Sequence, residues 1–118
     1  MINNNVIIDK SMDFAVRIVK LYRYLHDEKK EYVMSNQVLR SGTSIGANLR
    51  EGIYAQSKDD FISKMSIALK ETSETEYWIE LLFKTEYLSQ EQYTSVKNDC
   101  SELAKILTAT LKSSRLKK

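Results

Sequence analysis

Apolar residues recur at helical spacing in four segments of the chain. In the first, about residues 11–27, apolar and polar side chains occupy opposite halves of a helical wheel, the pattern of an amphipathic helix with one buried face. The third, about 58–85, keeps an uninterrupted 4-3-4-3-4-3 spacing from Phe61 to Leu82. At about 1.5 Å per residue, this predicts a helix roughly 40 Å long. A fourth stripe runs through about 90–112.

The second segment, about 36–55, is less regular at its centre. The stretch from Ser41 to Ser44 holds weak helix formers, which favour a loop on propensity alone. Gly42, Gly46 and Ala47 are small enough for a neighbouring helix to approach closely, which offsets part of that cost. We therefore predict a continuous helix through this segment.

Capping residues separate the four segments. Ser35 is a candidate N-cap for the second helix, and Ser57 with Asp60 resembles a capping box for the third. Ser89 and Gln92 form the S-x-x-Q capping pair of the fourth. Three short connections between four amphipathic helices predict an all-α fold, an antiparallel up-down-up-down four-helix bundle, in a single domain over residues 1–118.

Composition narrows the class of protein further. The 118 residues include no proline, three glycines and one cysteine, Cys100, which argues against a turn-rich β fold and against an internal disulfide. No apolar run approaches the roughly 20 residues of a membrane span, so we expect no membrane partner and a cytoplasmic location. The net charge of +2 is uneven, because the basic tail at 113–118 and the residue before it hold four basic residues and no acid.

A second apolar face on the third helix points to a partner surface. Ile67, Trp78 and Leu81 lie about 90° to 150° from the main stripe, near Tyr77. A single core does not easily cover both faces, and clustered exposed apolar residues are typical of interfaces. We predict self-association through this face. The alternative is that Trp78 packs at a corner of the bundle with its indole edge in water.

A line of polar residues follows the second helix beside its apolar stripe. Ser41, Ser44, Asn48 and Glu51 lie at i, i+3, i+7 and i+10. If Asn48 and Glu51 are partly buried they need hydrogen-bond donors, for which Arg40 and Arg50 are candidates. Such a network can fix helix register, bind a ligand or contact a neighbouring subunit, and a solvated polar face is the simpler alternative.

Residues for catalysis or metal binding are scarce. Di-iron bundles need Glu-x-x-His on two helices, whereas the only histidine, His26, follows Arg23 at i−3. His26 and Cys100 alone cannot build a zinc site, and no phosphate-binding glycine motif occurs. We expect no enzyme activity and no cofactor. An enzyme that uses Glu51, Glu71 and Glu74 with a metal is the least favoured hypothesis.

Two segments carry a family resemblance. The stretch Arg40-Ser-Gly-Thr-Ser-Ile-Gly-Ala-Asn-Leu-Arg-Glu-Gly52 resembles the R-x-x-x-S-I-x-x-N-I-x-E-G signature of the four-helix bundle proteins encoded in 23S ribosomal RNA intervening sequences. Lys70-Glu-Thr-Ser-Glu-Thr-Glu-Tyr-Trp78 resembles the K-E-x-x-E-T-x-Y-W segment common in one branch of that family. Leu49 stands where isoleucine is commoner, and Arg50 where alanine is commoner.

The resemblance implies a homo-oligomeric ring, with a pentamer as the expected form. Related accessory proteins of diversity-generating retroelements are similar in fold, form pentamers and work with a reverse transcriptase and nucleic acid. Carried over, the signature residues would have structural or interface roles. These residues are Arg40, Ser44, Asn48, Glu51, Gly52, Glu71, Glu74 and Trp78.

The leading functional hypothesis is therefore a non-enzymatic oligomeric module that binds RNA or a nucleoprotein. Basic side chains on the first helix and in the tail are the candidate phosphate contacts. They are Arg17, Lys20, Arg23, Lys112, Arg115, Lys117 and Lys118. The second hypothesis is a structural adaptor that binds another protein through the ring.

Overall fold

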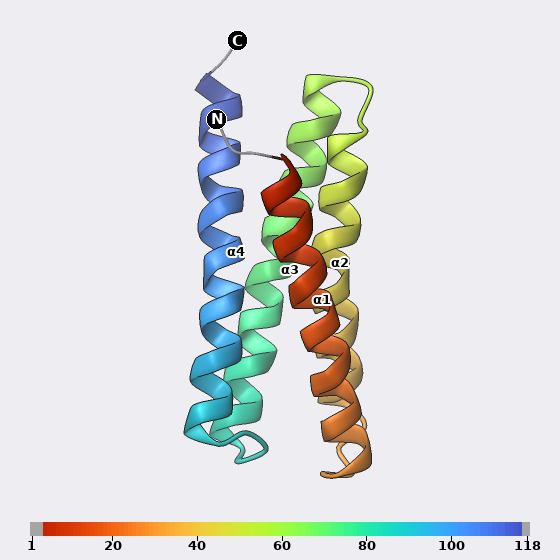
Figure 1. Ribbon diagram of the computed structural model, residues 1–118, viewed down its shortest axis with the longest axis vertical. Coiled ribbons are helices and arrows are strands. Elements are labelled where there is room, and N and C mark those ends of the chain that lie inside the picture. Colours follow the sequence, from red (N-terminus) through yellow and green to blue (C-terminus); the bar gives the residue numbers. More distant parts are fainter. Residues whose placement is uncertain (1–3, 117–118) are drawn as a thin grey trace.

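The computed structural model describes residues 4–116, which form four helices and contain no strand. The helices are α1 (Asn4–Asp27), α2 (Met34–Ile53), α3 (Lys58–Lys84) and α4 (Gln90–Leu116). They alternate in direction along a bundle of 48 × 22 × 20 Å (Figure 1). The prediction of an all-α chain with four helices is confirmed.

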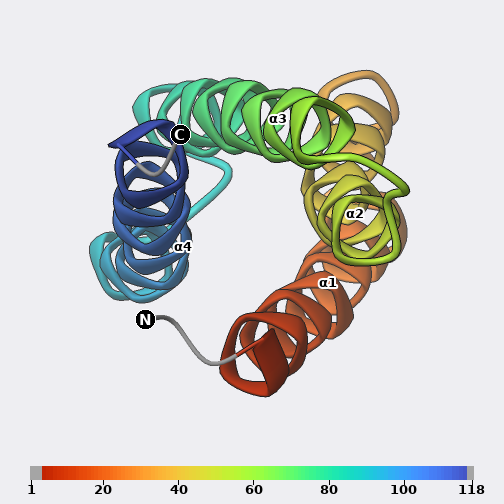
Figure 2. The same ribbon diagram turned by 90° about the horizontal axis from the view of Figure 1, so that it is seen from above.

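The helices follow one another around the bundle, so each packs beside its neighbours in the sequence. Seen from above, α2 lies between α1 and α3, and α3 lies between α2 and α4 (Figure 2). The contacts between α1 and α4, which close the circle, are far fewer than those between consecutive helices. The α1–α4 seam is therefore the most loosely packed side of the bundle.

Both outer helices extend further than the sequence pattern indicated. α1 begins at Asn4 rather than near residue 11, because Ile7 is buried and continues the apolar stripe. Ser11 lies inside the helix, where its hydroxyl donates to the carbonyl of Ile8 at 2.9 Å. α4 continues to Leu116, so residues 113–116 of the predicted basic tail are helical. Lys117 and Lys118 lie outside the described residues.

An acidic side chain, and not Ser35, caps the start of α2. The carboxylate of Glu31 accepts the backbone N–H groups of Val33, Met34 and Ser35 at 3.1, 3.0 and 2.7 Å. Only 7% of Glu31 is exposed, and these three bonds satisfy orphan donors of the first turn where negative charge is favourable. Ser35 is itself helical and buried, with its hydroxyl bonded to the Glu31 carbonyl at 2.8 Å. The predicted Ser35 cap is therefore wrong.

The other two predicted caps are present. The Ser57 hydroxyl accepts the N–H of Asp60 at 3.1 Å at the start of α3. Before α4, the N–H of Gln92 donates to the Ser89 hydroxyl at 3.1 Å, and the N–H of Ser89 donates to the Gln92 side chain at 2.8 Å. This reciprocal pair is a complete capping box.

The central part of α2 stays helical because its small residues admit α1. A Cβ atom built on Gly42 would lie 2.8 Å from Cγ2 of Ile18, and one on Gly46 would lie 3.2 Å from the Ser11 hydroxyl oxygen. Ile18 is fully buried, so it has no room to move aside. The predicted close approach is confirmed at both glycines, whereas Ala47 faces solvent.

This contact makes a stability prediction. Gly42→Ala should destabilise the protein by about 1–3 kcal/mol, because overpacking against Ile18 exceeds the gain of up to about 1 kcal/mol in helix propensity. Gly46→Ala is the matched control, since the Ser11 side chain is the nearest group and lies further away; we expect it to be near neutral. Urea unfolding followed by circular dichroism measures both. A Gly42→Ala variant as stable as the wild type would contradict the packing.

Candidate functional site

Four signature residues meet on the outer surface where α2 packs against α3. Arg40 extends from α2 and pairs through Nη1 with Oε2 of Glu71, at 3.3 Å, and through Nη2 with Oε2 of Glu74. The same Glu74 oxygen accepts the indole N–H of Trp78 at 3.0 Å. We call Arg40, Glu71, Glu74 and Trp78 the Arg40 cluster. It links two helices and fixes the orientation of an aromatic ring.

The cluster lies half in water. The Arg40 side chain is 49% exposed, whereas that of Glu71 is only 16% exposed. At such exposure the ion pairs are partly screened, and each contributes little to stability by itself. The main effect of the cluster is geometric. The Arg40 guanidinium bridges the carboxylates of Glu71 and Glu74, and Glu74 in turn holds the indole ring of Trp78 in one place through a hydrogen bond.

Trp78 is less exposed than the sequence predicted. It is half-buried and packs against the core of its own subunit, with its N–H satisfied by Glu74. This matches the corner packing weighed as the alternative. The exposed groups of the second α3 face are Tyr77, 59% exposed and edge-on to the Trp78 ring at 5.0 Å, and Ile67, 39% exposed. Leu81 is half-buried.

The remaining polar residues of the α2 signature are engaged within the subunit. The Ser44 hydroxyl donates to the carbonyl of Arg40 at 2.7 Å, and the Asn48 amide donates to that of Ser44 at 2.9 Å. Glu51 pairs with Lys64 of α3 at 3.0 Å, and this hydrogen bond, followed by the charge of Glu51, raises the pKa of Lys64. The expectation that Arg40 or Arg50 serves Asn48 and Glu51 is therefore wrong.

Beneath the Arg40 cluster, α2 and α3 share a buried polar contact that the sequence analysis missed. The Thr75 hydroxyl lies 2.9 Å from that of Ser41 and 2.8 Å from the Glu71 carbonyl, and both side chains are fully buried. Gly52 lets α2 and α3 approach closely at another point of the same interface, because a Cβ there would lie 2.9 Å from Cε of Met65. The signal was present as small or hydroxyl-bearing residues on the inward faces of both helices.

The predicted basic residues do not form one patch. Arg17 is not free for a ligand, since it pairs with Asp99 of α4 at 2.6 Å and bonds the Ser95 hydroxyl at 2.7 Å. The Arg17 side chain is still 36% exposed, at the edge of the seam with α4. Lys20 and Arg23 are exposed on α1.

On α4, Lys112 and Arg115 are both exposed. Arg115 reaches the Ser66 hydroxyl of α3 at 3.4 Å. The two remaining candidates, Lys117 and Lys118, are not among the described residues.

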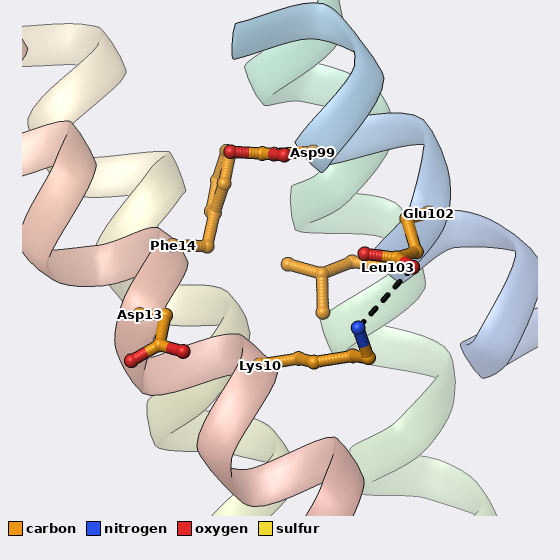
Figure 3. A pocket seen from close by; sticks show the side chains of 6 residues that line it. All are labelled: Lys10, Asp13, Phe14, Asp99, Glu102 and Leu103. Carbon is orange, nitrogen blue, oxygen red and sulfur yellow. Dashed lines mark ion pairs between the residues drawn. The ribbon is translucent and has the colours of Figure 1, made fainter. Parts of the chain in front are cut away.

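A depression of about 240 Å³ lies on the α1–α4 seam (Figure 3). The salt bridge between Lys10 and Glu102, 3.2 Å long, crosses it. The carboxylate of Asp99 on its wall already pairs with Arg17. Among residues 4–116, no three histidine, cysteine or acidic side chains are arranged to hold a metal ion. The depression therefore holds two acids that are paired across the seam, Glu102 and Asp99, and one further acid, Asp13.

The single cysteine lies in the core. Cys100 is fully buried and its thiol points at the Thr72 carbonyl, 3.5 Å away. Burial raises the pKa of this thiol to about 12, with smaller contributions from the charges of Glu76 and Asp99. A thiol that stays protonated and inaccessible at neutral pH is not a nucleophile.

The fold and the signature together define a class of four-helix proteins, and the comparisons agree with it. The chain belongs to the family described as 23S rRNA-intervening sequence protein, whose model matches residues 3–109. It is similar, with 60% sequence identity and a TM-score of 0.91, to a protein of unknown function from the S23 ribosomal protein family of Bacteroides thetaiotaomicron. That likeness covers 92% of this chain and 97% of the other. A search among curated proteins gives no match. None of the helices in the described part is long and apolar enough to cross a membrane.

The Arg40 cluster makes a prediction about coupling between α2 and α3. Arg40→Ala and Glu74→Ala should each destabilise the protein by about 1 kcal/mol, with a coupling energy of about 0.5–1 kcal/mol in the double mutant. Arg40→Lys should not restore the lost stability, since a lysine cannot bridge two carboxylates in the same geometry. Trp78 is the only tryptophan, so its fluorescence during urea unfolding reports on the environment of the Arg40 cluster and measures the stability of each variant. Additive effects of the two changes would show that the ion pair is not formed in solution.

Burial of Cys100 predicts slow modification and a pH effect on stability. A thiol reagent at pH 8 should label the native protein at least about 100-fold more slowly than the urea-unfolded chain. The pKa of the Cys100 thiol is raised in the folded protein from its ordinary value of 9.0 to about 12, so the stability that the protonated thiol contributes is complete below pH 9. It is lost as the pH rises from 9 towards 12, because only the unfolded state ionises readily there. Urea unfolding of wild type and Cys100→Ala across this range measures the difference, and equally fast labelling of native and unfolded protein would contradict burial.

Proposed function

We propose that this protein is a non-enzymatic, self-associating four-helix module that binds RNA or a nucleoprotein in the cytoplasm. The observation that carries the proposal is the outward face of α3, where the exposed Tyr77 ring packs against an indole fixed by the Arg40 cluster. Ile67 is exposed about three helical turns nearer the N-terminus of the same helix. Rigid, half-desolvated aromatic residues beside apolar ones are characteristic of protein interfaces.

A second exposed apolar area favours a ring. Met12 and Val16 of α1 are each 47% exposed and lie one helical turn apart, on a helix that α2 separates from α3 (Figure 2). A two-fold dimer uses one surface on both subunits, whereas a closed ring joins two different surfaces head to tail. Two apolar areas on separate helices therefore suit the ring, with a pentamer as the form that the family resemblance implies.

The RNA part of the proposal rests on the family and on charge. The family description names 23S rRNA, and exposed basic side chains remain on α1 and α4. Binding through such residues would be salt-dependent and weakly sequence-specific.

A structural adaptor for another protein is the second candidate. It is favoured by Arg17, whose guanidinium is engaged with Asp99, and by the exposed side chains of Ile67 and Tyr77 on α3. An adaptor would keep the self-association but would bind no RNA at low salt.

Self-association is tested by size-exclusion chromatography with light scattering at tens of micromolar protein. We expect the wild type to elute at a multiple of 13.7 kDa, and Ile67→Glu or Tyr77→Glu to shift it towards the monomer, because a buried unpaired charge costs several kcal/mol at an interface. Tyr54→Glu is the matched control, since Tyr54 is 78% exposed but lies at the α2–α3 turn. A monomeric wild type, or variants and control with the same mass as the wild type, would refute self-association through α3.

A further inference from the structure

The charges of α4 are segregated between its two sides. Its basic side chains at 97, 105, 112 and 115 fall within an arc of about 80° on a helical wheel, and all four are exposed. We call this the basic face; it consists of Lys97, Lys105, Lys112 and Arg115. The acidic residues of α4, namely Glu91, Asp99 and Glu102, fall outside the arc.

The fold explains this separation. Asp99 and Glu102 are drawn to the α1–α4 seam, where they pair with Arg17 and Lys10. No member of the basic face takes part in an ion pair among residues 4–116. Asp99 and Glu102 are thus neutralised at the seam with α1, while the bases of α4 are left to the solvent.

The basic face has the dimensions and the polar surroundings of a phosphate-binding surface. Lys97 and Arg115 are 18 residues apart, so the face runs about 27 Å along the helix. Exposed Asn98 and Thr108 lie between the charges and offer hydrogen bonds.

The upper end of the basic face is hollowed. Lys112 and Arg115 line a depression of about 300 Å³ that also touches Leu69 of α3 and Thr108. Arg115 there lies 3.4 Å from the Ser66 hydroxyl. Glu76 of α3 contributes to the raised pKa of the buried Cys100, so it lies nearer Lys97 than Arg115. The part of α4 from Lys105 to Arg115 holds three of the four cations of the basic face.

We propose that the basic face of α4 binds the sugar-phosphate backbone of RNA, with Lys105, Lys112 and Arg115 as the phosphate contacts. This inference rests on the proposed function, because it names the surface through which the proposed RNA binding takes place. A row of separated cations with small hydroxyl and amide side chains between them suits a chain of phosphates. A membrane surface is disfavoured, because membrane-binding helices place large apolar residues beside their cations, whereas none of the exposed residues between these cations is large and apolar.

The test compares two triple variants with the same net charge. Lys105→Gln/Lys112→Gln/Arg115→Gln removes three of the four cations of the basic face, and Lys30→Gln/Arg50→Gln/Lys84→Gln removes three exposed bases that lie outside α1 and α4. Each lowers the net charge from +2 to −1. All proteins are titrated as full chains against a fluorescently labelled single-stranded RNA of mixed sequence, at about 50 and 200 mM salt, with anisotropy as the readout.

We expect the α4 variant to bind at least about 10-fold more weakly at the lower salt concentration. Its plot of log affinity against log salt should flatten by about 2, near 0.7 for each lost contact with a single strand. The control variant should stay within about 2-fold of the wild type. Circular dichroism and light scattering on both variants show that fold and assembly are unchanged.

Three results would overturn the assignment, and they separate it from the proposed function. Equal losses in both variants would show that net charge alone attracts RNA, and the RNA-binding function would stand without this surface. If the wild-type protein binds no RNA at the lower salt concentration, both the assignment of the basic face and the proposed RNA binding would be wrong. That result would favour the adaptor function. If polyglutamate displaces the labelled RNA as effectively as unlabelled RNA does, the basic face would be a binding surface for acidic proteins.

Discussion

The structure depends on the small inward face of α2, which lets two other helices approach it at once. Gly42 admits Ile18 of α1, and Gly52 admits Met65 of α3, each where a Cβ atom would lie within 3.0 Å of the neighbour. Close backbone approach increases dispersion contacts between well-packed helices. These contacts also offset the free-energy cost of placing glycine and serine, which have low helix propensity, in this segment. Larger side chains at these two positions would separate α2 from both partners.

The position of α3 on α2 sets the surface features described above. With the helices this close, the Ser41 and Thr75 hydroxyls meet inside the interface, and Arg40 spans to Glu71 and Glu74 outside it. That salt-bridge geometry fixes Trp78. On the far side of α3, α4 packs with Asp99 and Glu102 turned towards α1 and its bases turned to solvent. One packing constraint thus leads, through successive helices, to an ordered aromatic surface on α3 and a basic one on α4.

Much of the fold follows from local patterns, and the differences have a shared cause. The 4-3 spacing of apolar residues gave the four helices, and the reciprocal Ser89–Gln92 pair located the start of α4 correctly. The Glu31 cap was missed because an acid in a charged loop shows no sequence sign that it will be buried against the next helix. The pairing of Arg17 with Asp99 was missed because the two residues are 82 positions apart. A helical wheel shows which side of a helix is polar but not which helix will cover it.

The signature by which the chain resembles its family acts mainly within the subunit. Ser44 and Asn48 bond carbonyls of their own helix, Glu51 pairs with Lys64, and Gly52 makes room for Met65. Side chains engaged in this way have little capacity left for a ligand. A partner must therefore be met by residues outside the signature or at its edge, such as Tyr77 and the cations of α4. By this reasoning, family members can share the same packed interface between α2 and α3 and still differ in what they bind, because the outer faces of α3 and α4 can change without disturbing it.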